Sequence, residues 1–360
     1  MARLTIEALS KYFGDQAALK NVSMQVEDGE FVAVLGPSGC GKTTMLRLVA
    51  GFDAVSEGKI AIGDRIVSGP GTHLPPEERR MGIVFQSYAL WPHMDVEENV
   101  AYALKVQKVA TVERAARVAR ALETVGLTSF RNRRPASLSG GQRQRVALAR
   151  CLAMQPEIVL LDEPLANLDV HLRASMEDEF ATFHKRTGTT MFYITHDQAE
   201  AMALADRIAV MDHGRILQFA PPSQLYREPA NETVARFIGA GMILPGKLAG
   251  EPANGRVAVD ILGHRAVIRC GPDHGAQGPV KICVRAQDLA VDRQASDPLS
   301  ARLRRLVYQG GHFQADLLLE NAENLPLALT LPEPCEVAPG DLLPIVLRDG
   351  WVVPQTDVLA

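Results

Sequence analysis

The stretch Gly36–Thr44 constrains the fold of this chain more than any other. It reads Gly-Pro-Ser-Gly-Cys-Gly-Lys-Thr-Thr, follows the apolar run Phe31–Leu35 and precedes the apolar segment Met45–Ala50. Strand, glycine-rich loop and helix in this order match the G-x-x-x-x-G-K-[ST] pattern, in which backbone N–H groups and a helix N-terminus face phosphate oxygens. The sequence therefore predicts a nucleotide-binding α/β domain.

The side chains of this loop predict how it binds phosphate. Its glycines leave no Cβ in the way of an anion. Lys42 supplies a point charge for the β and γ phosphates, and Thr43 supplies a hydroxyl ligand for Mg²⁺. We expect the nucleotide to contact the whole loop, which consists of Gly36, Pro37, Ser38, Gly39, Cys40, Gly41, Lys42, Thr43 and Thr44.

Length and charge limit the remaining possibilities. A chain of 360 residues suggests about two domains. With 38 basic and 42 acidic residues the net charge is −4, which argues against a general attraction to nucleic acid or anionic lipid. No apolar run approaches the ~18–20 residues that span a bilayer, so we expect a soluble, cytoplasmic chain. The five cysteines include no C-x-x-C pair and predict neither a zinc site nor a disulfide framework.

Residues 3–35 read as short alternating strands, which predicts an antiparallel β addition ahead of the nucleotide core. Within it, the segment Lys11-Tyr12-Phe13-Gly14 places two aromatic rings in an expected loop. Burial in the core is the structural explanation for such rings. Stacking on an adenine base is the functional one, because an aromatic face accepts any base.

Residues 88–152 read as a helical subdomain inserted into the α/β frame. Its first loop carries four large apolar side chains, which predict either a docking surface for a partner or a contribution to the subdomain's own core. Near its end, Leu138–Gln142 precedes an expected helix over Arg143–Met154, with Ser139 as a candidate N-cap. This is either a second anion-binding helix start or simply a capped helix. The four apolar residues of the first loop are Tyr88, Leu90, Trp91 and Met94.

Polar residues follow three further apolar strands. Gln86 follows one of them, Asp162 and Glu163 follow the second, and His196 follows the third. Ligand contacts in an α/β sheet gather at the carboxyl ends of its strands. Asp162 can join the Mg²⁺ shell, Glu163 can activate a water, and His196 can hydrogen-bond a γ-phosphate or the attacking water.

Together these motifs resemble the ATP-binding subunit of ATP-binding-cassette (ABC) importers over residues 1–235. The resemblance implies ATP and Mg²⁺ as cofactors, with Thr43, Gln86 and Asp162 near the metal. It implies catalytic roles for Glu163, His196 and Gln86, and adenine stacking on Phe13 with Tyr12 as the alternative. The matching motifs are Walker A at 36–44, Gln86 of the Q-loop, the signature at 138–142, Walker B at 158–163, Asp169 of the D-loop and His196 of the H-loop.

The same resemblance implies the domain organisation. An ABC nucleotide-binding domain of the P-loop NTPase fold covers 1–238, with its helical subdomain at about 88–152. A smaller all-β, OB-like (TOBE) regulatory domain covers 239–360. Strand-length runs separated by Gly, Pro and Asp turns agree with the second part. These runs are Arg256–Leu262, Val280–Val284, Ala315–Glu320, Leu325–Leu331 and Leu342–Arg348.

The resemblance also implies partners. In a head-to-tail homodimer, signature residues of one subunit and Asp169 contact the ATP held by Lys42 of the other. Two membrane permease subunits, and indirectly a periplasmic or extracellular solute-binding protein, complete an importer on the cytoplasmic face of the membrane, with no nucleic acid. A polyamine, ferric iron or a phosphonate is the expected solute, with sugar or sulfate as alternatives. The competing class is a soluble ABC ATPase switch acting on nucleic acid or the ribosome. The signature residues expected at the nucleotide are Ser139, Gly140, Gly141 and Gln142.

Overall fold

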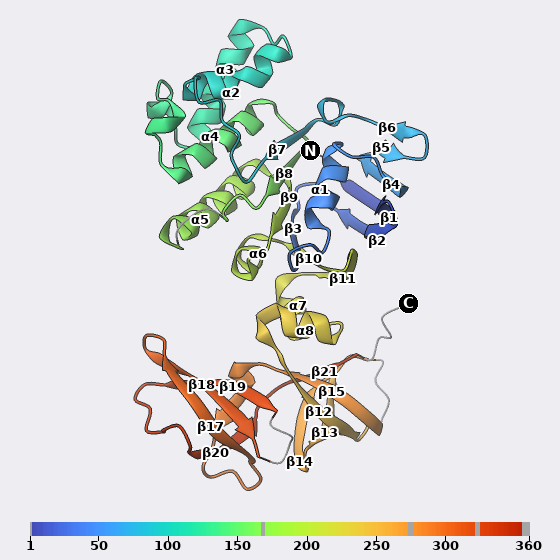
Figure 1. Ribbon diagram of the computed structural model, residues 1–360, viewed down its shortest axis with the longest axis vertical. Coiled ribbons are helices and arrows are strands. Elements are labelled where there is room, and N and C mark those ends of the chain that lie inside the picture. The colour runs from blue at the N-terminus through green and yellow to red at the C-terminus, as the bar shows by residue number, and fades with distance from the viewer. Residues whose placement is uncertain (1, 167–169, 273–276, 321–324, 355–360) are drawn as a thin grey trace. The chain divides into compact units, whose positions relative to one another are not determined.

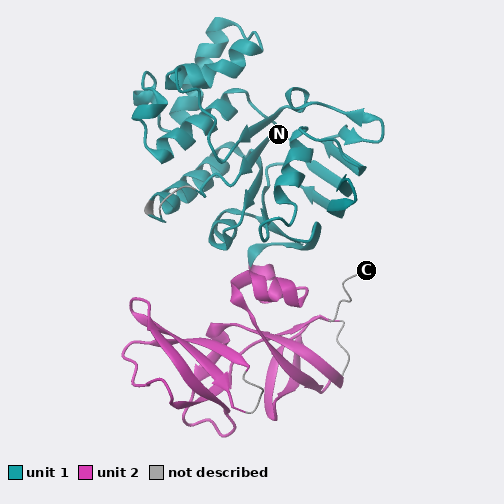
Figure 2. Ribbon diagram, in the orientation of Figure 1, with its two compact units in different colours: residues 1–222 teal, residues 223–360 magenta. Residues whose placement is uncertain are grey.

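A computed structural model describes residues 2–166, 170–272, 277–320 and 325–354. Contacts divide the chain into two compact units, Met1–Pro222 and Ser223–Ala360 (Figure 2). This division falls earlier than the boundary expected at 238/239, because helix α8 (Glu232–Phe237) packs on strands of the second unit.

A six-stranded sheet forms the centre of the first unit, in the order β11-β10-β3-β9-β8-β7 (Figure 1). Its strands are parallel except for β11 at one edge. Every residue of β3 and of β9 is buried, as expected for strands covered on both faces. The strands are β3 (Phe31–Leu35), β7 (Met81–Val84), β8 (Ile158–Asp162), β9 (Thr190–Thr195), β10 (Arg207–Asp212) and β11 (Arg215–Ala220).

A second, antiparallel sheet in the order β2-β1-β4-β5-β6 confirms the predicted β addition. Strand β1 reaches Phe13 and pairs it with Gln16, so Tyr12 and Phe13 end a strand instead of lying in a loop. The turn between β1 and β2 has two residues and is tight enough to need Gly14, whose φ is +59°. The strands are β1 (Leu4–Phe13), β2 (Gln16–Val26), β4 (Glu57–Ile62), β5 (Arg65–Gly69) and β6 (Thr72–His73).

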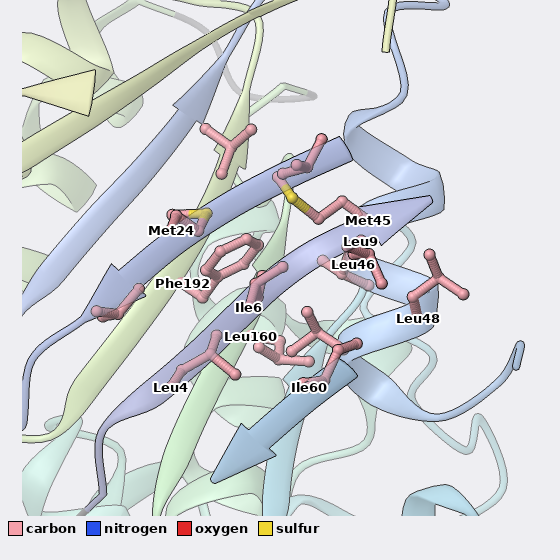
Figure 3. Close-up of a cluster of buried hydrophobic side chains, with 14 of the residues drawn as sticks. Leu4, Ile6, Leu9, Met24, Met45, Leu46, Leu48, Ile60, Leu160 and Phe192 are labelled. Atoms are coloured by element: carbon pink, nitrogen blue, oxygen red, sulfur yellow. The ribbon is translucent and has the colours of Figure 1, made fainter. Parts of the chain in front are cut away.

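Helix α1 (Lys42–Ala50) contributes to one apolar core together with both sheets. Met45, Leu46 and Leu48 of the helix meet side chains of β1, β4, β8 and β9 in this core (Figure 3). Burying each such side chain stabilises the fold by about 1.5–3 kcal/mol. The core therefore fixes the helix, and with it the loop that precedes the helix.

The inserted helical subdomain lies between β7 and β8, as predicted. Helix α4 begins at Gly140, earlier than the expected Arg143, because Ser139 caps it. Among the described helices, none is both long and apolar enough to cross a bilayer. The helices of the first unit after α1 are α2 (Val96–Val106), α3 (Thr111–Thr124), α4 (Gly140–Ala153), α5 (Val170–Thr187) and α6 (Gln198–Leu204).

Buried Asn99 and partly buried Arg150 fix the loop that enters this subdomain. The Asn99 amide donates to the carbonyl of Trp91 at 3.1 Å and accepts from its N–H at 2.8 Å. The Arg150 guanidinium donates to the carbonyls of Tyr88 at 2.9 Å and Ala89 at 2.6 Å. Trp91 is 42% exposed, but Tyr88 is only 9% exposed, so Tyr88 belongs to the core and not to the expected docking surface.

The second unit begins with helices α7 (Pro222–Arg227) and α8 and continues as β structure. One set of strands closes into a barrel in the order β12-β13-β14-β21-β15, and a second sheet has the order β16-β20-β17-β18-β19. One apolar core is shared by both. The predicted runs match β13, β15, β18, β19 and β20, whereas the other five strands were not predicted. The strands are β12 (Met242–Ala249), β13 (Arg256–Ile261), β14 (His264–Arg269), β15 (Gln277–Val284), β16 (Leu289–Val291), β17 (Leu299–Tyr308), β18 (His312–Leu319), β19 (Pro326–Pro332), β20 (Leu342–Leu347) and β21 (Trp351–Val353).

Buried Arg285 joins the two helices of this unit to its barrel. Its guanidinium donates to the carbonyl of Tyr226 at 3.1 Å and to the carbonyls of Ala235 and Ile238, and it lies 4.6 Å from the Tyr226 ring centroid. The Tyr226 carbonyl belongs to α7, the Ala235 carbonyl belongs to α8, and Ile238 directly follows α8. The helices are therefore an integral part of the second unit.

Candidate nucleotide site

The strand order brings the predicted site residues to one edge of the sheet. Strand β9 lies between β3 and β8, and β7 lies next to β8 (Figure 1). All four are parallel, so their carboxyl ends share one edge. Leu35 pairs with Thr195, and Ile194 pairs with Asp162. The glycine-rich loop, His196, Glu163 and Gln86 therefore follow four neighbouring strands.

The glycine-rich loop borders a cavity of about 510 Å³. Gly41 is the N-cap of α1 with φ 110°, and no side chain caps the helix. A Cβ on Gly41 would lie 2.7 Å from the carbonyl oxygen of Ala18, and one on Gly36 would lie 2.3 Å from that of Met211. Glycine is therefore required at both positions. The cavity is lined by Asp15, Gln16, Ala17, Ala18, Lys20, Gly39, Gly41, Lys42, Thr43, Thr44, His213 and Gly214.

Lys42 is buried, although its ammonium group forms no ion pair with an acid among the described residues. Its Nζ donates to the carbonyls of Gly36 at 2.7 Å and Pro37 at 3.0 Å. Two carbonyl oxygens offset only part of the cost of burying a charge. A phosphate in the cavity would supply the missing negative charge. Cys40 Sγ lies 4.0 Å from Nζ, yet burial outweighs this attraction and raises the pKa of Cys40.

The two acids after β8 differ in their surroundings. Burial raises the pKa of Asp162, and the charge of Glu163 raises it further, while Lys42 opposes both. Glu163 has a left-handed backbone, with φ 44°, and its N–H donates to the carbonyl of Ile194 at 2.9 Å. Its Oε2 lies 3.1 Å from Nδ1 of His196. The carboxylate and the imidazole can therefore act on the same water molecule.

The residues present fit a magnesium ion. Two adjacent carboxylates, one of them disfavoured as an anion by burial, gain from a nearby divalent cation. Thr43 is exposed in the first turn of α1, where its hydroxyl is accessible. Gln86 is exposed just beyond β7 on the same sheet edge. Oxygen donors of this kind suit Mg²⁺.

The two aromatic candidates are both accessible at the end of β1. Phe13 is 54% exposed and Lys11 Nζ lies 5.0 Å from its ring centroid, while the Tyr12 hydroxyl lies 3.5 Å from Oε2 of Glu57. The adjacent residues Asp15 to Ala18 line the cavity. This arrangement favours Phe13 as the stacking residue, and the assignment stays a prediction.

The signature residues form a separate site. Ser139 caps α4 by accepting from the N–H of Gln142 at 3.3 Å, and the Gln142 side chain accepts from the N–H of Ser139 at 2.9 Å. Neither these two nor Gly140 and Gly141 belong to the described residues that line the glycine-loop cavity. Asp169 lies outside the described residues. One chain therefore brings the glycine loop together with the catalytic candidates but not with the signature.

One residue that supports the helix after the glycine-rich loop was not predicted from the sequence. Arg79 is almost completely buried and donates to the carbonyls of Leu48 at 2.7 Å and Val49 at 2.8 Å, which end α1, and to that of Leu74 at 2.8 Å. Burial lowers its pKa to about 10, so it remains charged at neutral pH. A cation at the C-terminus of a helix stabilises the helix dipole. No local sequence signal distinguishes Arg79 from its exposed neighbour Arg80.

Comparison with known proteins places these motifs in context. The family described as ABC transporter matches residues 19–166. The spermidine/putrescine import ATP-binding protein PotA of Oleidesulfovibrio alaskensis is 38% identical, with 97% of this chain and 96% of that protein covered. The sn-glycerol-3-phosphate import ATP-binding protein UgpC of Paracoccus denitrificans is 40% identical, covering 95% and 93%. The trehalose/maltose import ATP-binding protein MalK of Thermococcus litoralis is 49% identical, covering 67% and 65%.

Solved structures agree for the first part of the chain. An ATP-binding cassette in a dimeric, post-hydrolysis state bound to ADP and Pi is 32% identical, with a TM-score of 0.53 over 61% of this chain and 98% of that one. A component of an ABC transporter complex of Clostridium perfringens is 30% identical, with a TM-score of 0.57 over 65% and 92%. The nucleotide-binding fold predicted from the sequence is confirmed.

Proposed function

The chain belongs to the family of ATP-binding subunits of ABC importers, and from this we propose that its glycine-loop cavity, Asp162, Glu163 and His196 form the ATPase site. Its activity is ATP hydrolysis coupled to import across a membrane. The observation that carries the residue assignment is the contact between Glu163 and His196 on the strands next to the glycine loop.

In this mechanism the chain positions ATP and a water molecule. Lys42 and the N–H groups that begin α1 hold the β and γ phosphates. Glu163 accepts the proton of the water that attacks the γ-phosphorus, and His196 orients that water and the phosphate through its imidazole. Thr43, Asp162 and Gln86 would hold Mg²⁺, which supplies charge neutralisation to the transferring phosphoryl group.

The test of this assignment is Glu163→Gln. The amide keeps the side-chain shape but cannot accept the proton of the water, so turnover should fall by about a hundredfold or more while ATP affinity stays within about threefold. Single-turnover hydrolysis and equilibrium titration with labelled ATP measure the two quantities. The matched control is Glu157→Gln, which removes a surface carboxylate paired with Arg80 and should leave turnover unchanged. Turnover within a few-fold of wild type would exclude Glu163 as the base.

The complete site requires two copies of the chain. We propose a head-to-tail dimer in which Ser139 and Gly141 of one copy cap the ATP held by Lys42 of the other. The separation of signature and glycine-loop cavity within one chain supports this arrangement, as does the dimeric state of the similar cassette. Gel filtration of Glu163→Gln with ATP should then show a dimer.

A polyamine is the first candidate for the solute. A spermidine/putrescine import protein is similar over 97% of this chain. Sugar import is the alternative, supported by the trehalose/maltose relative, and sn-glycerol 3-phosphate is a third candidate. Relatives of the import class also favour import over a soluble switch on nucleic acid or the ribosome. Uptake of labelled putrescine, maltose and glycerol 3-phosphate by the assembled transporter would decide among them.

The membrane partner is expected to contact the loop that carries Trp91. Half-exposed Trp91 packs at 5.4 Å ring to ring against Tyr102, which is also exposed, and Asn99 fixes the loop beneath it. Exposed apolar groups on a rigid loop are typical of a protein interface. Trp91→Ala should leave basal ATPase intact and reduce co-purification with the permease subunits about tenfold. Val112→Ala, another exposed apolar position of the insert, is the control. Undiminished assembly of the Trp91 variant would refute this docking site.

A further inference from the structure

Behind His196 lies a buried carboxylate that the mechanism above does not use. Glu200, in the first turn of α6, is 2% exposed. Its Oε2 accepts from the hydroxyls of Tyr193 and Thr195, each at 2.7 Å. Its Oε1 lies 3.7 Å from Nε of Arg173. A carboxylate withdrawn from water to this extent is tolerated only with such partners.

The residues on either side of His196 are both tied to this group. Thr195 donates its hydroxyl to Glu200 and accepts from the N–H of Asp197 at 2.9 Å. Asp197 caps α6 through Oδ1, which accepts from the N–H of Ala199 at 2.8 Å. Its Oδ2 accepts from Arg173 Nη1 at 3.0 Å. The backbone of His196 is therefore held from both sides by a cluster that includes Glu200 and Arg173.

We propose that Glu200 is a positioning residue for hydrolysis, which holds His196 at hydrogen-bonding distance from Glu163. It acts through Thr195 and Arg173 and, within the part of the chain that the structure describes, contacts neither the nucleotide loop nor Glu163. The proposal rests on the proposed roles of Glu163 and His196. Displacing a reacting group by about 1 Å can cost about a hundredfold in rate. Because Glu200 holds Thr195, the residue before His196, its loss is expected to slow hydrolysis.

Arg173 gives the cluster a second connection. It lies in the first turn of α5, which starts directly after the segment that contains Asp169. Its guanidinium joins this turn to both Asp197 and Glu200. A shift of the start of α5, such as contact with a second subunit would produce, is therefore transmitted to the segment 195–197. The cluster links the state of the expected dimer junction to the Glu163–His196 contact.

The test is Glu200→Gln in the full-length protein. The amide keeps the size of the side chain but loses the charge that faces Arg173. If its oxygen accepts from the two hydroxyls, its NH₂ points at the guanidinium of Arg173, and in the opposite orientation its NH₂ points at the hydroxyls, so one side of the cluster loses its acceptor. We expect kcat to fall at least tenfold while KM for ATP and the affinity for ATP stay within twofold. The ring ¹⁵N resonances of His196, assigned by their loss in His196→Ala, should shift even without nucleotide. A merely structural role would leave these resonances and this kcat-against-KM split unmoved in the folded variant.

A matched control is Glu177→Gln on α5, whose carboxyl is also close to Arg173 and Glu200. It should leave kcat within twofold and the His196 resonances unchanged. If Glu200→Gln does not fold, Arg173→Lys carries the test, because a single ammonium cannot join both Asp197 and Glu200, and kcat should again fall with KM unchanged. Wild-type kcat and resonances in a folded Glu200→Gln would overturn the proposal. Wild-type turnover in Glu163→Gln would instead overturn the proposed function.

Discussion

The two helix starts that the sequence singles out are built in opposite ways. At α1 the N-cap is Gly41, which has no side chain to offer, and the first turn borders a cavity with a buried lysine. At α4 the N-cap is Ser139, and Ser139 and Gln142 satisfy each other's backbone N–H groups in a capping box. The first start leaves its donors to a ligand, and the second supplies partners from its own side chains.

This difference indicates how the work is divided between copies of the chain. The α1 start, Lys42 and the two acids at the end of β8 all come from one chain. The α4 start is stable without a ligand, which suits a surface that stays exposed until a second copy brings its nucleotide. An uncapped helix start in that position would cost stability whenever the protein is monomeric.

The largest effect is expected from Gly41→Ala at the α1 start. Alanine would be forced to φ 110° with its Cβ 2.7 Å from the carbonyl oxygen of Ala18. Strain of about 2 kcal/mol or more should lower ATP affinity by about thirtyfold or more. Equilibrium titration with labelled ATP measures this change, and an affinity within threefold of wild type would show that the loop tolerates a Cβ.

Gly141→Ala at the α4 start is the matched control. Its Cβ would first meet a side-chain methyl of Leu172 at 3.0 Å, which can move, and the backbone there is not left-handed. ATP binding by the isolated chain should stay within twofold, whereas turnover should fall because the dimer junction is altered. Loss of ATP affinity in this variant would erase the contrast between the two helix starts.

A smaller effect is expected from Ser139→Ala, which removes the cap of α4. Loss of an N-cap costs about 1 kcal/mol, or a melting temperature lower by about 2–4 °C in a domain of this size. ATP affinity of the monomer should not change. Thermal unfolding with and without ATP separates the two readouts, and an unchanged melting temperature would mean that the capping box does not stabilise α4.

The smallest effect is expected from removing the carboxylate charge of Asp162. The pKa of Asp162 is raised by burial and by Glu163, so its ionisation opposes folding. That cost is absent below the pKa of the unfolded chain, near 4, and grows as pH rises through the folded pKa. Asp162→Asn should therefore be slightly more stable than wild type at pH 7 without nucleotide, with a difference that shrinks towards pH 4. Urea unfolding across this range checks the sign, and a less stable variant would contradict it.

Sequence reasoning predicted the elements whose defining residues are adjacent in the chain. The glycine loop between β3 and α1, the acids at the end of β8 and the capped start of α4 each combine a local residue pattern with an adjacent strand or helix, and the structure has all of these elements. The functional roles of their side chains stay predictions. The approximate extent of the helical insert follows from the same periodicity. These features depend on neighbours in the chain and need no knowledge of the tertiary fold.

Sequence reasoning missed buried polar side chains whose partners lie outside their own helix or strand. Arg79, Asn99 and Glu200 are buried polar residues whose partners come from other elements, and nothing in their local sequence marks them. The sequence left Tyr88 open between a docking surface and the core of the insert. Arg150 donates to the Tyr88 carbonyl, and the Tyr88 ring is buried. Of the five unpredicted strands of the second unit, β16 and β21 have three residues each, which is too short for an alternating pattern to be recognised.

The hydrogen bonds from Arg150 to the loop before α2 have a consequence for how this subdomain moves. Arg150 lies in the last turn of α4, and Ser139 lies at its start. A helix rises about 1.5 Å per residue, so Ser139 and Arg150 are about 16 Å apart along one stiff helix. At the far end, the carbonyls of Tyr88 and Ala89 are bonded to that helix. A rotation of α4 that brings Ser139 onto a nucleotide would therefore also move the segment before Trp91, because the rigid helix and the hydrogen bonds of Arg150 connect the two.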